Sequence, residues 1–565
     1  MLAYVFRVVL ATVARRSRRR FDATLADAAR INEQALRRIL RRQAQTEFGR
    51  QHRFGEIARA ADVWGEYRRS VPLSVYTDYE SAIARMVAGE RNVLTRDRPL
   101  FFALSSGTTG SPKTIPVTTP ALQRSLNAML LSHEVLARFR PAATTSRGIS
   151  LLRMSSSKST TPDGTPIGDA SAFGMRRAVW CLPWLYTTPR VAFDIADKPT
   201  ALFVHLVFAL RAPDFDHVSA TFANYILQFF RTLEDRWPQL LETIATGRLP
   251  PDLVLSTATR AELERRLRPD PQLAERLRPE FAAGMHGIAR RVWPRVSAVA
   301  AVCTGSFAHY VPAIREYVGD ATICSLLYGT TESPVAINLD PQRPREYVLI
   351  PGAAAFEFIP VDDDTSGDPS RTVRIDELRT DRQYEVVVSN YSGFYRYRIG
   401  DVVRVVGMRD ASPIVEFDYR RGMVIDLAAE KMTEQQIAHA VTGLRTGYPE
   451  LRVVDYTVAA DVASTPPRYR VFMEAGGVTN PGAAQSRAQR CLDAGLSGAN
   501  VDYAILRRDR GIGEPRVDFV GPGTFEALLE QARRGRLPNV NTLKVPRLVR
   551  DKSQLEFLES RCLKV

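Results

Sequence analysis

The chain has 565 residues, of which 77 are Lys or Arg and 62 are Asp or Glu, so its formal net charge is +15. A hydrophobic content of 45% is ordinary for a globular protein and excludes a disordered or collagen-like chain. The five cysteines form no C-x-x-C pair, which excludes a disulfide scaffold and a Cys-ligated zinc site. We therefore expect reduced thiols and a cytoplasmic location.

The basic excess is concentrated at the start of the chain. Residues 1–50 hold twelve Arg and no Lys against four acidic residues, a balance of +8 that leaves only +7 for the other 515 residues. Because the body of the protein is nearly balanced, we expect no nucleic-acid partner.

Residues 1–20 predict an amphipathic helix with apolar residues on one side and a run of arginines after them. The apolar run is too short to span a bilayer, and its charges follow rather than precede it, unlike those of a secretory signal. Two alternatives remain. We favour a helix that packs against the body of the protein over one that rests peripherally on the anionic inner face of a membrane.

The elements that follow indicate a mixed α/β fold with a large N-terminal domain over residues 1–425. Apolar spacing predicts helices over 22–46 and 119–139 and throughout 200–318, and strands on either side of a loop at 105–113 and at Ala321–Tyr328. Residues 345–420 are β-rich and predict a sheet or small barrel, in which a turn at Asn390–Gly393 joins Tyr384–Ser389 to Phe394–Ile399.

After residue 425, helical and extended patterns alternate again. This succession predicts a smaller α+β domain over residues 433–565, joined to the first by a hinge at 426–432.

The loop after the first predicted strand reads SSGTTGSPKT, from Ser105 to Thr114. Glycine lets the backbone approach a ligand and point N–H groups at an anion, while hydroxyls add donors and Lys113 adds charge. A polyphosphate is the natural ligand of such a loop. The lysine does not follow the second glycine directly, so this is not a Walker loop.

Two later clusters complete the parts that an ATP site requires. In LYGTTES, Tyr328 beside a glycine turn can stack on a base, and Thr331 and Glu332 can meet a phosphate and its Mg²⁺. In YRYRIGDVV, Asp401 follows Gly400 and can accept both hydroxyls of a ribose. Each cluster alone is equally compatible with a turn or a hairpin, but together the three predict an ATP-using enzyme.

These three motifs, in this order, resemble the signatures of the acyl-adenylate-forming enzyme superfamily. CTGSFAHYVP at 303–312, TESPVAINLDP at 331–341, YEVVVSNYSGFYRYRIGDVVRV at 384–405 and NTLKVPR at 541–547 resemble, more narrowly, the auxin-responsive Gretchen Hagen family of acyl acid amido synthetases. The resemblance implies that a carboxylic acid reacts with ATP to give an acyl-adenylate, whose acyl group passes to the amine of an amino acid.

The resemblance also implies roles for residues that match the family motifs. Lys544 would stabilise the charge that develops during adenylation, and Glu332 would bind Mg²⁺. Nucleotide contacts would come from Ser105, Ser106, Thr108 and Thr109 at the phosphates, from Tyr328, Gly329, Thr330 and Thr331, from Asp401 at the ribose, and from Arg421 and Lys431.

Two other functions remain as alternatives. The same adenylating chemistry could pass the acyl group to a thiol, of coenzyme A or a carrier protein. A non-catalytic scaffold held at a membrane by the basic N-terminus is the third hypothesis, but it predicts degraded motifs, whereas the first loop, Glu332, Asp401 and Lys544 are all present.

Overall fold

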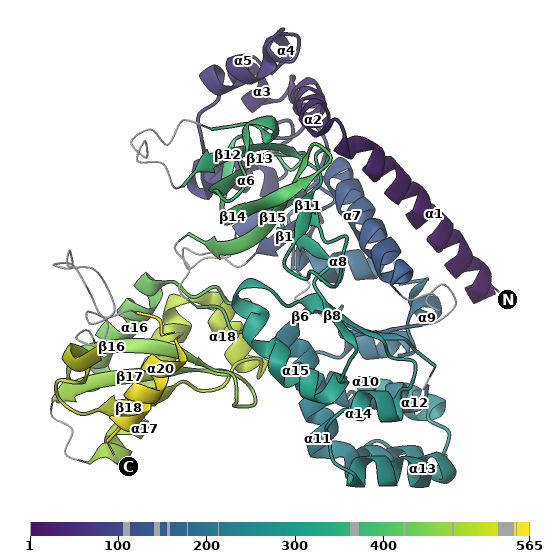
Figure 1. The fold of residues 1–565 in the computed structure, drawn as a ribbon, viewed down its shortest axis with the longest axis vertical. Coiled ribbons are helices and arrows are strands. Elements are labelled where there is room, and N and C mark those ends of the chain that lie inside the picture. The colour runs from purple at the N-terminus through teal and green to yellow at the C-terminus, as the bar shows by residue number, and fades with distance from the viewer. Residues whose placement is uncertain are drawn as a thin grey trace. The chain divides into compact units, whose positions relative to one another are not determined.

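The computed structural model describes residues 2–105, 113–139, 147–154, 159–177, 179–212, 214–361, 372–421, 425–476, 480–528, 547–549 and 551–563. The chain divides into two compact units, the first ending at Arg421 and the second containing the described residues from Ile425 onward. The fold is mixed α/β, as predicted (Figure 1).

The first unit contains three sheets among its described residues. The largest is antiparallel, with the strand order β12-β13-β14-β15-β11-β10-β9. Its strands are β9 (Leu327–Gly329), β10 (Pro334–Ile337), β11 (Tyr347–Leu349), β12 (Ala355–Pro360), β13 (Gln383–Ser389), β14 (Tyr397–Arg409) and β15 (Ser412–Arg420). The predicted β-rich region at 345–420 is thus one part of a larger sheet.

A parallel sheet of order β3-β6-β7-β8 lies within the region for which helices were predicted. Its strands are β3 (Ile149–Ser150), β6 (His217–Phe222), β7 (Ala298–Val302) and β8 (Thr322–Cys324). The prediction of helices throughout 200–318 is therefore wrong for two segments, β6 and β7. The predicted strand Ala321–Tyr328 is also two strands, because β8 and β9 belong to different sheets.

The third sheet, of order β2-β1-β5-β4, carries the first motif. Its strands are β1 (Phe101–Ser105), β2 (Lys113–Val117), β4 (Ser159–Thr160) and β5 (Pro166–Gly168). Helices surround the three sheets: α1 (Leu2–Leu25), α2 (Ala28–Gln43), α3 (Glu47–Gln51), α4 (Phe54–Ile57), α5 (Val63–Ser70), α6 (Glu80–Val87), α7 (Thr119–Arg138), α8 (Ala170–Arg177), α9 (Leu182–Leu185), α10 (Lys198–Leu210), α11 (Ala223–Thr246), α12 (Thr257–Arg266), α13 (Pro271–Ala282), α14 (Ile288–Val292) and α15 (Val311–Val318).

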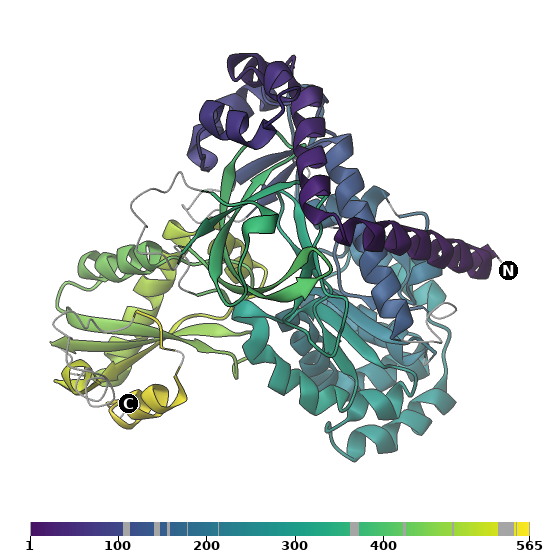
Figure 2. The same cartoon turned by 45° about the horizontal axis from the view of Figure 1, so that its top comes forward.

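The N-terminal helix α1 lies along α7 (Figures 1 and 2). Phe21 and Leu25 pack against Leu131 of α7, and the buried Arg18 donates to Glu134 at 3.3 Å. Packing against the body, the favoured alternative for residues 1–20, is therefore confirmed for one face of the helix. The predicted helix over 22–46 is wrong in its start, because α1 runs on to Leu25 and α2 begins only at Ala28. Among the described helices, none has an apolar stretch long enough to cross a membrane.

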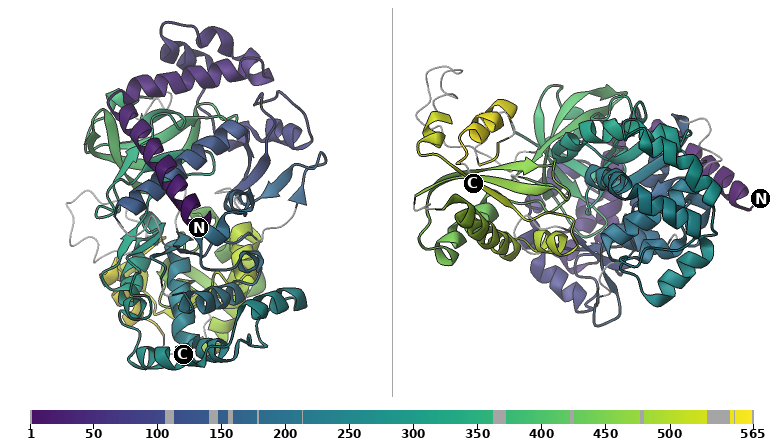
Figure 3. Two further views of the ribbon diagram at one scale, coloured as in Figure 1. Left: turned by 90° about the vertical axis from the view of Figure 1, so that its right-hand side faces the viewer. Right: turned by 90° about the horizontal axis from the view of Figure 1, so that it is seen from below.

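The second unit is a three-stranded sheet with helices on both faces (Figure 3). Its elements are β16 (Arg452–Asp461), β17 (Arg468–Gly476), β18 (Arg516–Val520), α16 (Glu434–Gly447), α17 (Pro481–Ala499), α18 (Val501–Arg508) and α20 (Lys552–Ser560). Successive side chains of β17 point to opposite faces of the sheet, so the strand contributes to a core on each face. Val471 and Met473 pack in the core shared with α16 and α17, while Phe472 packs with Leu558 of α20.

A buried ion pair fixes the residue that precedes β14. Arg396 has a left-handed backbone with φ of 46°, and its side chain and that of Glu357 on β12 are each only 2% exposed. The Arg396 guanidinium donates to Glu357 at 3.1 Å, to the Val71 carbonyl at 2.9 Å and to the Thr372 hydroxyl at 3.1 Å. It therefore joins the sheet to the segment after α5.

We expect Arg396→Met to lower the unfolding free energy of the first unit by about 2–3 kcal/mol, because the substitution removes the buried partner of Glu357. The loss stays below that of a fully uncompensated charge, since the partly exposed Arg68 still donates to Glu357 at 3.0 Å. All five tryptophans lie in this unit, so tryptophan fluorescence during urea unfolding reports on it alone. Arg404→Met on β14 is the matched control, because the Arg404–Asp418 pair at 3.1 Å is partly exposed and should contribute less than about 1 kcal/mol. Equal losses in both variants would contradict the structural role of Arg396.

Candidate active site

Asp401 lies near the start of β14, where its carboxylate is buried between two partners. Arg420 is its register partner across the β14–β15 hairpin, and the Arg420 Nε donates to Asp401 Oδ1 at 2.5 Å. Tyr328 donates its hydroxyl to Asp401 Oδ2 at 2.8 Å. Burial by itself would lower the pKa of Arg420, but the charge and hydrogen bond of Asp401 outweigh it and raise that pKa. The carboxylate is thus paired and fixed in direction.

Tyr328 reaches this carboxylate from the β9–β10 hairpin. Its ring meets Tyr347 and Phe417 edge-on, with centroids 6.0 and 5.9 Å away. Burial, and then the charge of Asp401, raise the pKa of Tyr328 well above its ordinary value, so the phenol remains a donor. The second motif is therefore anchored to the third through a hydrogen bond between residues 73 positions apart.

The turn between β9 and β10 carries Thr331 and Glu332, both half-buried. Thr330 closes the turn, because its backbone N–H donates to the Ser333 carbonyl at 2.9 Å. Asn390 holds the turn from the neighbouring loop by donating its Nδ2 to the Glu332 carbonyl at 2.9 Å. The backbone of this turn is thus fixed on both sides of Glu332.

Lys113 brings the first motif to the same region. It is the first residue of β2 and the register partner of Ser105 at the end of β1. Its ammonium group donates to the Tyr397 hydroxyl at 3.1 Å and lies 5.5 Å from the centroid of the Tyr76 ring. Burial lowers the pKa of Lys113, and the charge of Glu332 partly opposes that shift. For Tyr397 the two effects act in the same direction: burial and the charge of Glu332 both raise its pKa.

These contacts join the three motifs within the first unit. Lys113 from the first motif, Glu332 from the second and Tyr397 from the third influence one another electrostatically. Lys113 and Tyr397 are 284 positions apart. A basic group, a carboxylate and a fixed pair of hydrogen-bond acceptors on Asp401 are what a nucleotide with its phosphates and ribose requires.

Several predicted site residues lie outside the described part of the chain: Ser106, Thr108, Thr109 and Lys544. Ser105 is described only as the last residue of β1. The roles assigned to them stay predictions.

Arg421, for which a contact with the nucleotide was predicted, and its neighbour Arg420 have different protein partners. The nucleotide contact of Arg421 stays a prediction. Arg421 pairs with Glu385 at 2.9 Å, whereas Arg420 holds the Asp401 carboxylate. Arg420 was not predicted from the sequence. Its only signal was its position opposite Asp401 in a hairpin whose register the sequence does not define.

Lys431 belongs to the second unit and has a left-handed backbone with φ of 47°. It sits in a closed loop in which Ile425 pairs with Met432 and the buried Glu430 accepts from the Leu427 and Ala428 amides, both at 2.7 Å. Burial and the neighbouring Asp426 raise the pKa of Glu430 to about 8. The segment 426–432 is thus well bonded inside its own unit, and the hinge stays a prediction.

A metal ion would have few protein ligands here. Among the described residues, no group of three or more His, Cys, Asp or Glu side chains could hold one. Mg²⁺ in nucleotide sites commonly takes one or two carboxylates and completes its coordination with phosphate oxygens and water. A single carboxylate, that of Glu332, is compatible with such a site.

Comparison with known proteins agrees with this geometry. The chain matches the GH3 family N-terminal domain over residues 17–323, the GH3 family central domain over 347–420 and the GH3 family C-terminal domain over 433–553. It is 32% identical to a probable indole-3-acetic acid-amido synthetase of Oryza sativa, over 95% of this chain and 88% of that protein. It is 28% identical to a jasmonoyl–L-amino acid synthetase of Nicotiana attenuata, over 94% of this chain and 92% of that protein.

Among solved structures, the fold is similar to that of the GH3.15 acyl acid amido synthetase. The TM-score is 0.65 and the sequence identity 26%, over 96% of this chain and 95% of the other. Matches to all three family domains and to relatives along nearly the whole chain have one explanation: the protein is a member of the GH3 family.

Proposed function

We propose that this protein is an ATP-dependent acyl acid amido synthetase, which adenylates a carboxylic acid and then joins the acyl group to the amine of an amino acid. The observation that carries the proposal is the convergence of Lys113, Glu332, Tyr328 and Asp401, from three separate motifs, in one unit of a GH3 protein. Two of the relatives that it resembles are named as a probable indole-3-acetic acid-amido synthetase and a jasmonoyl–L-amino acid synthetase.

The chemistry requires activation of the acid. A carboxylate is a poor electrophile because its leaving group would be oxide, whereas an acyl-adenylate releases AMP. Negative charge builds on phosphate oxygens as pyrophosphate leaves, so fixed cationic groups and N–H donors lower the barrier. Lys113 supplies one such charge, and Lys544 is proposed as a second.

The residues present fit ATP. Each oxygen of Asp401 accepts one hydrogen bond from the protein, and a carboxylate can accept about four in total. Two acceptor positions therefore remain for the ribose hydroxyls. Mg²⁺, when bound beside Glu332, would neutralise phosphate charge.

The direct test is ATP–pyrophosphate exchange by the purified full chain with a panel of indolyl, aryl and aliphatic acids, followed by mass spectrometry with pooled amino acids. Exchange with a given acid and a product of the mass of its amide support the proposal. Exchange with a thioester as the product would support the thiol alternative, and no exchange with any acid by a folded, ATP-binding protein would overturn adenylation.

We expect Asp401→Asn to lower kcat/KM for ATP about a hundredfold, because two hydrogen bonds from ribose to a charged acceptor are weakened. The same variant should lose most of the preference of the enzyme for ATP over 2′-deoxy-ATP. Asp410→Asn makes the same chemical change at the exposed turn of this hairpin and should leave both quantities unchanged. An unaltered ATP preference in Asp401→Asn would refute the ribose role.

Lys113 should set the alkaline limb of the exchange reaction. Because its pKa is lowered, the ammonium group loses its proton at a lower pH than an ordinary lysine, and kcat/KM for ATP should fall as pH rises through that value. Lys113→Arg should move this limb to higher pH, since arginine stays charged. A limb at the same pH in both proteins would assign it to another group.

Lys544→Ala should slow adenylation about a hundredfold or more and largely spare the reaction of preformed acyl-adenylate with the amine. Lys552→Ala is the control, since the side chain of Lys552 is 90% exposed. Equal losses in both half-reactions of Lys544→Ala would indicate general damage instead of a role in adenylation.

A further inference from the structure

Helix α1 has a second face, which the residues that the structure describes leave exposed. Its buried side follows the spacing Ala11, Ala14, Arg18, Phe21 and Leu25. On other sides of the same helix, five large apolar residues within ten positions are 41–55% exposed: Tyr4, Val5, Val8, Val9 and Val13. Contiguous exposed apolar residues on a helix indicate a surface that is covered by a partner.

The outward face becomes basic where its apolar part ends. Arg15, Arg16, Arg19 and Arg20 are all exposed, and none of them forms an ion pair or hydrogen bond with another residue that the structure describes. Asp22, the acidic residue of α1, is already bonded to Arg18 at 2.7 Å. The surface thus consists of an apolar N-terminal half and a basic C-terminal half. Within the described part of the chain, no acidic group is bonded to these four arginines.

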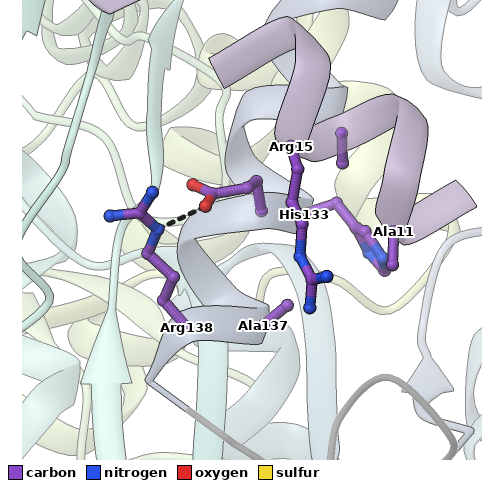
Figure 4. Close-up of a pocket in the computed structure, with 7 residues that line it drawn as sticks. Ala11, Arg15, His133, Ala137 and Arg138 are labelled. Carbon is purple, nitrogen blue, oxygen red and sulfur yellow. Dashed lines mark hydrogen bonds and ion pairs between the residues drawn. The ribbon is translucent and has the colours of Figure 1, made fainter. Parts of the chain in front are cut away.

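One of these arginines also lines a cavity between α1 and α7. The cavity has a volume of about 300 Å³, and Figure 4 shows Arg15 and Ala11 of α1 facing His133 and Ala137 of α7. The acidic residue that lines this cavity is Glu134, and its carboxylate accepts from Arg18 through one oxygen and from Arg138 through the other. The cavity can therefore accept an anionic group beside Arg15.

An exposed tryptophan lies beside the apolar half. Trp180 is 62% exposed, and its ring meets Phe6 of α1 edge-on, with centroids 5.5 Å apart. Tryptophan favours the boundary between lipid headgroups and acyl chains.

We propose that the outward face of α1 docks this protein on an anionic lipid surface. The valines and Trp180 enter the headgroup boundary, while Arg15, Arg16, Arg19 and Arg20 bind lipid phosphates, one or two turns further along the helix. A second copy of the chain fits this surface less well, because the α1 helix of that copy offers the arginines no acidic partner besides Asp22, which is bonded to Arg18. The inference is independent of the proposed reaction.

The test is flotation of the full chain with vesicles of phosphatidylcholine alone or with about one third phosphatidylglycerol, at physiological salt. We expect recovery with the anionic vesicles only. Two triple variants should each lower the partition coefficient about tenfold or more. One combines Val5→Ser, Val9→Ser and Val13→Ser, and the other combines Arg16→Gln, Arg19→Gln and Arg20→Gln. These side chains are exposed, and thermal unfolding verifies that both variants fold.

The matched control replaces Arg59, Arg268 and Arg276 by Gln. These arginines are exposed on other helices and loops of the first unit, so the net charge changes equally. The control should float like the unaltered protein.

Quenching of Trp180 fluorescence by brominated lipid, lost in Trp180→Phe, would place the N-terminal half of α1 at the boundary between headgroups and acyl chains. The proposal is overturned if the protein does not float, if the control loses as much as the arginine variant, or if the valine variant floats normally. Dimerisation that the valine variant abolishes, without flotation, would assign the surface to a second copy.

Discussion

The arrangement of the first unit depends on the buried Arg396–Glu357 ion pair, which fixes where β14 begins. A charge this deep in the protein is tolerated only because its hydrogen-bond donors are satisfied, by Glu357, Thr372 and the Val71 carbonyl. The chain then enters β14 directly, with Tyr397 buried one position later and Asp401 four positions after that. The site is therefore built on the rigid part of the sheet.

From this strand, the site divides into two parts with different electrostatics. Asp401 is paired with Arg420 and Tyr328, so its charge is balanced within the protein before any ligand arrives. Lys113 lies in a buried aromatic environment, where burial lowers its pKa. The charge of Glu332 partly opposes that shift, and Arg420 and Asp401 contribute less, in opposite directions. In the proposed reaction, one part would present fixed acceptors to the ribose, and the other would present charge to the phosphates. Preorganised groups of this kind stabilise developing charge without having to reorient.

Local pattern predicted the fold class and the existence of the β-rich region, but not how the strands are distributed among sheets. β6 and β7 are short apolar segments between long helices, and periodicity does not separate such segments from buried helical turns. β8 and β9 are separated by only two residues, yet belong to different sheets. Membership of a sheet is decided by hydrogen-bond partners far away in the sequence.

The sequence by itself determined the three motifs, and with them Lys113, Tyr328, Glu332 and Asp401, because the chemistry of nucleotide binding restricts residue type and local spacing. Only the tertiary structure decided that Arg420 holds Asp401, and that Lys113 meets Tyr397. It also decided which face of α1 is covered. Each of these depends on strand register or helix packing, which a one-residue shift would change without altering any motif.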